Sequence, residues 1–172
     1  KGDTAITFQI SDKKYPAQYL KIKNKRMVNP NSSDEKRIND DRVIINKALS
    51  TWTEQASVDT DFTAPVDGRL SSLFGLKRFF NKQPKDPHGG LDIAASAGTP
   101  IKAPASARVI DTGNFYYNGN TVFLDHGQGL ISGYFHMTDI HVIPGQQIKQ
   151  GDVLGTVGKT GRVTGPHLHW NT

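Results

Sequence analysis

The sequence contains no cysteine, which excludes disulfide bonds, thiolate nucleophiles and cysteine-ligated zinc together. Long uncharged apolar runs are also missing, and the longest fall well short of the ~18–20 residues that a transmembrane helix needs. A glycine period and a sustained heptad are both absent, which excludes collagen and coiled coil. With 35% hydrophobic and 22% charged residues, the chain is too apolar for a disordered protein and too polar for a membrane protein.

Length and charge bound the remaining classes. A chain of 172 residues fits one main domain with an appendage. The net charge of +5 suits an acidic partner such as nucleic acid, an anionic membrane or a cell-wall polymer, and equally a soluble domain with excess lysine. The chain starts at Lys1 without methionine or signal peptide. We therefore expect a mature or trimmed fragment, with any upstream signal peptide or membrane anchor outside it.

We expect residues 1–61 to form a small N-terminal accessory region with a linker. Two stretches, 5–10 and 19–23, alternate apolar and polar residues with period two, which predicts two half-buried strands. Residues 53–61 are polar and uneven, which indicates a linker.

The accessory region also contains one predicted helix, from about residue 34 to residue 52. Ser32 and Glu35 have the spacing of a capping box, with Ser32 as the N-cap. Apolar residues then recur at helical spacing along one face: Ile38, Ile45, Leu49 and Trp52.

From Phe62 onward the pattern of apolar and turn-forming residues changes. Short apolar runs, such as 109–110, 121–124 and 153–157, are broken every few residues by glycine, proline or asparagine. Many short strands separated by closely spaced turns are typical of an all-β domain. We therefore expect a mainly β domain over residues 62–172.

All six histidines lie in this second region. Gly165 and Pro166 disfavour a helix at His167-Leu168-His169, and the following residues have strand character. Residues two apart on a strand point to the same face, so His167 and His169 are expected to project into one site.

A second motif supplies a histidine and a carboxylate. His88 and Asp92 are four residues apart, and the two glycines between them make a helix unlikely. On a strand or a bulged strand the two side chains would share a face. Together with one histidine of the His-x-His they provide three N/O ligands, the set of a catalytic zinc site with an open fourth position. Two histidines and one carboxylate also describe the facial triad of non-haem iron oxygenases.

Two imidazoles remain once three ligands are chosen: His136 and the second histidine of the His-x-His. Imidazoles beside a metal are suited to general-base and oxyanion roles. His126 and His141 have no partner by spacing, and we expect structural or surface roles for both.

Residues 64–170 closely resemble the lysostaphin/LytM-type zinc metallopeptidases, which cleave peptide bonds in bacterial peptidoglycan. The resemblance runs through many short motifs in order: Pro65-Val66-x-Gly68, Ser72-x-Phe74-Gly75, His88-Gly89-Gly90-Leu91-Asp92, Gly98-Thr99-Pro100, Gly119-Asn120-x-Val122, His126-Gly127, Tyr134-x-His136, Gly151-Asp152-x-Leu154-Gly155 and Gly158-x-Thr160-Gly161 with Gly165-Pro166-His167-Leu168-His169.

The resemblance implies a LytM-like antiparallel β-sheet domain with one Zn²⁺ per chain. By position, it makes His88, Asp92 and His169 the zinc ligands. It makes His136 and His167 the catalytic pair, without saying which of them is the base. Two departures stand out: Leu76-Lys77-Arg78 replaces a lone arginine, and the chain stops at Thr172, which predicts a truncated sheet edge.

The implied function is a zinc endopeptidase that hydrolyses peptide cross-links of peptidoglycan. Its partners would be stem peptides, not nucleic acid, with a regulatory or adaptor protein as a further candidate. The expected location is the periplasm or cell envelope, of a diderm rather than a monoderm bacterium. Relatives divide between Gly–Gly and D-Ala–diaminopimelate bonds, and residues 160–165 resemble the diderm type. The alternative is an inactive LytM-like regulator that activates a wall amidase; such relatives lose zinc ligands, whereas this chain has all three.

Overall fold

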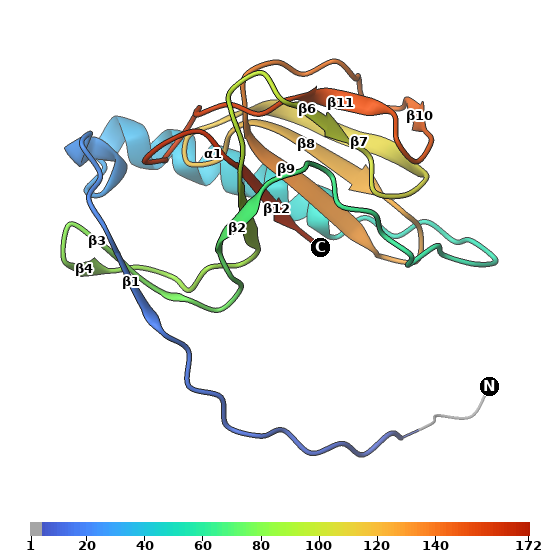
Figure 1. Cartoon of the computed structure of the whole chain (residues 1–172), viewed down its shortest axis with the longest axis horizontal. Coiled ribbons are helices and arrows are strands. Elements are labelled where there is room, and N and C mark those ends of the chain that lie inside the picture. Colours follow the sequence, from blue (N-terminus) through green and yellow to red (C-terminus); the bar gives the residue numbers. More distant parts are fainter. Residues whose placement is uncertain (1–4) are drawn as a thin grey trace.

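The computed structural model describes residues 5–172 and confirms a mainly β fold with antiparallel sheets (Figure 1). Its elements in chain order are β1 (Ala17–Leu20), the 3-10 helix η1 (Lys25–Met27), α1 (Ser32–Leu49), β2 (Arg69–Ser72), β3 (Lys77–Phe80), β4 (Gln83–Pro84), β5 (Leu91–Ala94), β6 (Pro100–Lys102), β7 (Ala107–Phe115), β8 (Gly119–Asp125), β9 (Ile131–Met137), β10 (Gln147–Ile148), β11 (Val153–Thr156) and β12 (Leu168–Asn171).

A seven-stranded antiparallel sheet is the centre of the molecule, with the strand order β10-β7-β8-β9-β12-β5-β2. A two-stranded sheet, β11-β6, lies over one face of it, and α1 runs across the other (Figure 1). The sheet is therefore buried on both faces over much of its width.

Strand β8 shows how the sequence serves both faces. Val122 and Leu124 belong to the larger core, on the side of β6 and β11, whereas Phe123 between them packs toward α1. On the α1 side, Phe123 meets the ring of Phe135 edge-on, with 5.7 Å between centroids, and Ala48 of α1 packs against this cluster. Because alternate residues of a strand point to opposite faces, one unbroken apolar run fills two core layers.

The N-terminal strands differ from the expectation. Residues 5–10 form no strand and are exposed, because no neighbouring strand pairs with them; their alternation was misleading. The second predicted strand is shifted and shorter: β1 covers Ala17–Leu20 and pairs in parallel with β3. Tyr19 of β1 stacks on Phe79 of β3 with centroids 4.8 Å apart, so β1 belongs to a small separate sheet with β3 and β4.

Helix α1 begins and ends earlier than predicted. Its N-cap is Asn31, not Ser32: the Asn31 side chain accepts from the Asp34 backbone N–H, and the Asp34 carboxylate accepts from the Asn31 N–H. The capping box is therefore present one residue upstream. The helix stops at Leu49: Ser50 is the C-cap, with φ −91° and ψ 7°, and the Thr51 N–H bonds to the Ala48 carbonyl three residues back, so the four-residue helical pattern ends there. Among residues 5–172, no helix has the length and apolar character needed to cross a membrane.

The position of the cap can be tested by comparing two substitutions. Asn31→Ala should lower the free energy of unfolding by about 1 kcal/mol, because it leaves a helix N–H without its acceptor. Ser32→Ala should change it by less than about 0.5 kcal/mol, since Ser32 lies inside the helix. Urea denaturation followed by circular dichroism measures both values. A larger loss for Ser32→Ala would place the cap where the sequence first suggested it.

Candidate metal centre

Three residues meet near the β2 edge of the main sheet, on the neighbouring strands β5 and β12 and in the loop before β5. Asp92 lies on β5 and His169 on the neighbouring β12, where antiparallel pairing sets the two residues directly opposite each other. His88 lies in the loop before β5. Of the two residues expected on one strand, only Asp92 is therefore on a strand. Gly90 lets this loop approach β12, because a Cβ there would lie 2.4 Å from the Trp170 carbonyl oxygen.

The donor atoms of these three residues converge on one point. His88 Nε2 lies 2.9 Å from Asp92 Oδ1 and 2.9 Å from His169 Nδ1, and His169 Nδ1 lies 2.7 Å from Asp92 Oδ1. His88 and Asp92 are buried, and the His169 side chain is 16% exposed. Among residues 5–172, this is the one group of metal-binding side chains whose donor atoms all lie within 4.8 Å of one another.

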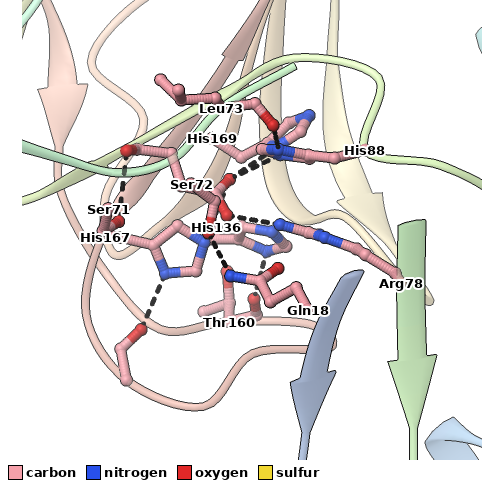
Figure 2. Close-up of polar contacts among 12 residues, drawn as sticks. Gln18, Ser71, Ser72, Leu73, Arg78, His88, His136, Thr160, His167 and His169 are labelled. Carbon is pink, nitrogen blue, oxygen red and sulfur yellow. Dashed lines mark hydrogen bonds and ion pairs between the residues drawn. The ribbon is translucent and has the colours of Figure 1, made fainter. Parts of the chain in front are cut away.

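Surrounding groups fix the orientation of the cluster (Figure 2). His88 Nδ1 donates to the Leu73 carbonyl oxygen at 2.8 Å, which directs its Nε2 lone pair toward Asp92. Arg78 of β3 donates to Asp92 Oδ2 at 2.5 Å and leaves Oδ1 facing the two imidazoles. Such contacts are typical of the groups that orient metal ligands from outside the coordination shell.

His136 reaches the cluster through a β-bulge. Between Asn120 and Val122 the register of β8 and β9 shifts, and His136 takes the left-handed conformation with φ 64°. A bulge re-aims a side chain, and this conformation in a residue other than glycine costs on the order of 1–3 kcal/mol. His136 Nδ1 donates to the Thr160 carbonyl oxygen at 2.9 Å, which leaves Nε2 as an acceptor.

His167 lies beside His136 (Figure 2). Its Nε2 is 3.7 Å from Asp92 Oδ1, and its Nδ1 donates to the Gly165 carbonyl oxygen at 2.9 Å. The rings of His136 and His167 are 4.9 Å apart between centroids. Both imidazoles therefore have one nitrogen fixed by a backbone carbonyl and the other free to act as an acceptor.

Burial and charge set the protonation states of this group. Burial is the largest influence and would raise the pKa of Asp92, but the close imidazoles of His169 and His88 together outweigh it and hold that pKa well below its usual range. Burial, with repulsion from His167 and His169, lowers the pKa of His136 to about 3. Burial also lowers the pKa of His169, against the attraction of Asp92. The Asp92 carboxylate is thus ionised and the His169 imidazole neutral, which are the forms that bind metal, and the neutral His136 imidazole is able to accept a proton.

Cavities on two sides give access to the cluster. One, of about 260 Å³, is lined by Asp92, His136 and His167, and the other, of about 210 Å³, by His88 and His169. Strand β1 borders the first cavity, where Gln18 Nε2 donates to Ser72 Oγ at 2.6 Å. The N-terminal region thus contributes a wall of the site, which the sequence did not reveal.

The donor set fits a catalytic divalent metal. Two imidazole nitrogens and one carboxylate oxygen, with a cavity beside them, match the three protein ligands and open position of catalytic zinc. Three atoms with acceptor lone pairs at 2.7–2.9 Å would repel one another, and a cation between them removes that repulsion.

Two histidines stay outside the cluster, in agreement with the expectation for them. His141 is exposed, whereas His126 is buried between the Ser106 carbonyl and the Ser132 hydroxyl. Arg78 was noted in the sequence only as a departure from the usual motif. The structure shows that β3 brings its guanidinium to Asp92 despite the two preceding residues.

His126 should make stability depend on pH. Burial lowers the pKa of His126 below the value near 6.5 of the unfolded chain. Its contribution is therefore complete above about pH 6.5 and decreases as the pH falls, by at most about 1.4 kcal/mol per pH unit. Thermal unfolding between pH 7 and pH 5 should show a smaller decline for His126→Asn than for wild type. His141→Asn is the matched control and should behave as wild type; equal slopes for all three would contradict the prediction.

Comparison with known proteins assigns the chain to a protein family. Residues 86–172, half of the chain, match the sequence pattern of peptidase family M23. The chain belongs to peptidase family M23. The matched part includes all five residues of the site.

Individual M23 relatives cover different parts of the chain. Peptidoglycan DD-endopeptidase ShyA of Vibrio cholerae is 40% identical over 109 residues, which are 62% of this chain and 25% of that protein. Cell division protein DipM of Caulobacter vibrioides is 37% identical over 132 residues, 75% of this chain and 21% of that protein. The chain thus spans about a quarter of the length of these relatives.

Solved M23 structures agree with the fold. A peptidase M23 from Pseudomonas aeruginosa has a TM-score of 0.72 and 47% identity, covering 81% of this chain and 56% of its own. A zinc-containing peptidase from Vibrio cholerae has a TM-score of 0.60 and 33% identity, covering 65% and 36%. These similarities establish an M23 peptidase domain and support a metal cofactor.

Proposed function

We propose that this chain is a zinc-dependent endopeptidase that hydrolyses peptide cross-links in bacterial peptidoglycan. One observation carries the proposal: His88, Asp92 and His169 converge within 2.9 Å beside the paired imidazoles of His136 and His167. The family match supports peptide hydrolysis, and relatives named DD-endopeptidase and DD-carboxypeptidase/endopeptidase support a peptidoglycan substrate.

In the proposed mechanism His88 Nε2, Asp92 Oδ1 and His169 Nδ1 would hold the zinc ion. When bound, zinc supplies Lewis-acid activation of the scissile carbonyl and of the attacking water. The Leu73 carbonyl holds the His88 ring in place, and the Arg78 guanidinium holds the Asp92 carboxylate. The protein therefore presents a preformed site, so little reorganisation is needed when substrate arrives.

His136 and His167 would move the protons. With Nδ1 bonded to a backbone carbonyl, each ring presents Nε2 to the space beside Asp92. A neutral Nε2 accepts a proton from the attacking water, and the protonated ring then donates a hydrogen bond to the developing oxyanion or a proton to the leaving amine. The pair thus provides both proton acceptance and proton donation without a glutamate.

The proposed location follows from the substrate. Peptidoglycan lies outside the cytoplasm, so we place the chain in the periplasm or cell envelope, and the Vibrio and Caulobacter relatives favour a diderm host. The net charge of +5 would support adsorption to the anionic wall, which salt should weaken. Regulation by an adaptor protein is compatible with the match to a cell division protein.

The alternative is an inactive regulator of a wall amidase. The similarity to DipM, named for cell division and not for peptidase activity, is the observation in its favour. Against it, five residues suited to metal binding and proton transfer are all present and close together. A protein that had lost catalysis would not need to keep the bulge and the strained backbone of His136.

Metal removal tests the proposal directly. Protein purified without added metal should contain about one zinc per chain by elemental analysis. It should release soluble muropeptides from purified sacculi. This release should stop after EDTA treatment and resume when zinc is added back. Iron in place of zinc would favour an oxygenase-type centre instead. An unchanged muropeptide profile with full zinc occupancy would favour the inactive regulator.

A further inference from the structure

Arg162 lies at the border of the site, in the loop between β11 and β12. Its backbone N–H donates to the Tyr117 carbonyl oxygen at 2.8 Å, which attaches this loop to the turn between β7 and β8. Gly161, with φ 75°, permits the contact: a Cβ there would lie 2.4 Å from the same oxygen. The backbone contacts therefore fix the position of the Arg162 Cα, from which the side chain extends.

Two aromatic rings hold the Arg162 guanidinium. It lies 4.0 Å from the ring centroid of Tyr117 and 4.7 Å from that of Phe80. Stacking of this kind positions a guanidinium without using any of its five N–H donors. The side chain is thus oriented before any ligand is bound.

The guanidinium has no acceptor of its own. Among residues 5–172, no carboxylate or carbonyl accepts a hydrogen bond from the Arg162 side chain, whereas Arg78 and Arg26 pair with Asp92 and Asp34. A half-buried guanidinium without a partner is costly, because its donors have lost part of their hydration. The arrangement is typical of a site for an anion that comes from outside.

Arg162 also lies next to the proposed reaction centre. It lines the 260 Å³ cavity together with Asp92, His136 and His167, and the 210 Å³ cavity together with His88 and His169. In the first cavity the lining carboxylate is Asp92, which Arg78, His88 and His169 already engage. The second adds Asp86, which forms no ion pair with Arg162 within 4.0 Å. The cavity beside the catalytic pair therefore has one uncommitted charge, and it is positive.

We propose that Arg162 binds a free carboxylate of the substrate beside the scissile bond, and so selects cross-links that carry one. The inference rests on the proposed function and specifies its substrate class. In a D-Ala–diaminopimelate cross-link the carbon attached to the scissile nitrogen bears a free carboxylate, whereas a bond inside a glycine bridge has none nearby. A guanidinium can bind this group through two parallel hydrogen bonds, which fixes both position and angle.

The test compares two peptides that differ in one group. Both contain the same D-Ala–diaminopimelate bond, with the carboxylate beside the scissile nitrogen either free or converted to a carboxamide. The wild-type enzyme should cleave the peptide with the free carboxylate with a kcat/KM about 10- to 100-fold higher than that for the carboxamide peptide. Arg162→Gln should lose that factor on the carboxylate peptide and change little on the carboxamide. Arg162→Lys, which keeps the charge without the planar fork, should fall between them.

Matched controls separate recognition from folding. Arg108→Gln removes an exposed arginine of β7 outside both cavities and should leave both rates unchanged. Circular dichroism and zinc content confirm that each variant is folded and loaded. If Arg162→Gln lowers both rates equally, Arg162 supports the loop and the inference is wrong.

A binding measurement distinguishes this inference from the proposed function. Calorimetry of EDTA-treated protein with each peptide removes any contribution of the metal to carboxylate binding. Preference for the carboxylate peptide that disappears in Arg162→Gln supports the inference, even if neither peptide is cleaved and the enzymatic proposal fails. Equal affinity of wild type for both peptides would overturn the inference, whatever the activity.

Discussion

His169→Ala is expected to release the metal and lower peptide hydrolysis by at least about 10³-fold. The residue supplies Nδ1, 2.9 Å from His88 Nε2 and 2.7 Å from Asp92 Oδ1, so its loss leaves two ligands. Two ligands bind zinc much more weakly than three. Zinc per chain after dialysis, measured by elemental analysis, should drop from about one to near zero.

His141→Ala is the matched control for this substitution. His141 is exposed and outside the cluster, so both zinc content and activity should remain at wild-type levels. Full zinc occupancy in His169→Ala would remove His169 from the ligand set. Loss of zinc together with loss of the folded circular dichroism spectrum would show a structural role for the metal as well.

His136→Ala is expected to keep the metal and lower kcat by about 10²- to 10⁴-fold. His136 is not one of the three converging donors, and its Nδ1 is already bonded to the Thr160 carbonyl. Removing it therefore leaves the cluster intact and deletes one acceptor beside the reacting atoms. Zinc content and kcat, measured on the same preparation, separate this outcome from that of His169→Ala.

His167→Ala completes the comparison. Its Nε2 lies 3.7 Å from Asp92 Oδ1, and its loss should likewise preserve zinc and reduce kcat. If the two histidines act as one unit, the double variant will lose little more than either single variant. Loss of zinc in His136→Ala would mean that His136 is a ligand, which would contradict the proposed roles.

The sequence predicted the mainly β fold because its information is local. Turn residues at short intervals and apolar runs of strand length need no knowledge of distant partners. The same local rules placed α1 to within a few residues and the capping box to within one. They failed for residues 5–10, whose alternation is that of a strand but which have no strand beside them. A strand is stable only when its backbone groups are paired, and that depends on tertiary structure.

The metal site, like the fold, was predicted in part from the sequence and in part depends on the tertiary structure. The identities and spacing of His88, Asp92 and the His-x-His marked candidate ligands, because ligand chemistry belongs to the side chains themselves. Spacing alone left open which histidine of residues 167 and 169 would join them. The structure brings His169 opposite Asp92 through the register of β5 and β12. Register is a relation between two strands, so neither strand's sequence contains it.

The sequence by itself determined the fold class, the residue types able to bind a metal and the family to which they belong. Only the tertiary structure decided that Arg78 would reach Asp92 from β3, that a bulge would turn His136 toward the cluster, and that Arg162 would lie between two aromatic rings without an acceptor. Each of these depends on segments far apart in the chain. Their contacts follow from strand pairing and packing, which act through space and leave no periodic pattern along the sequence.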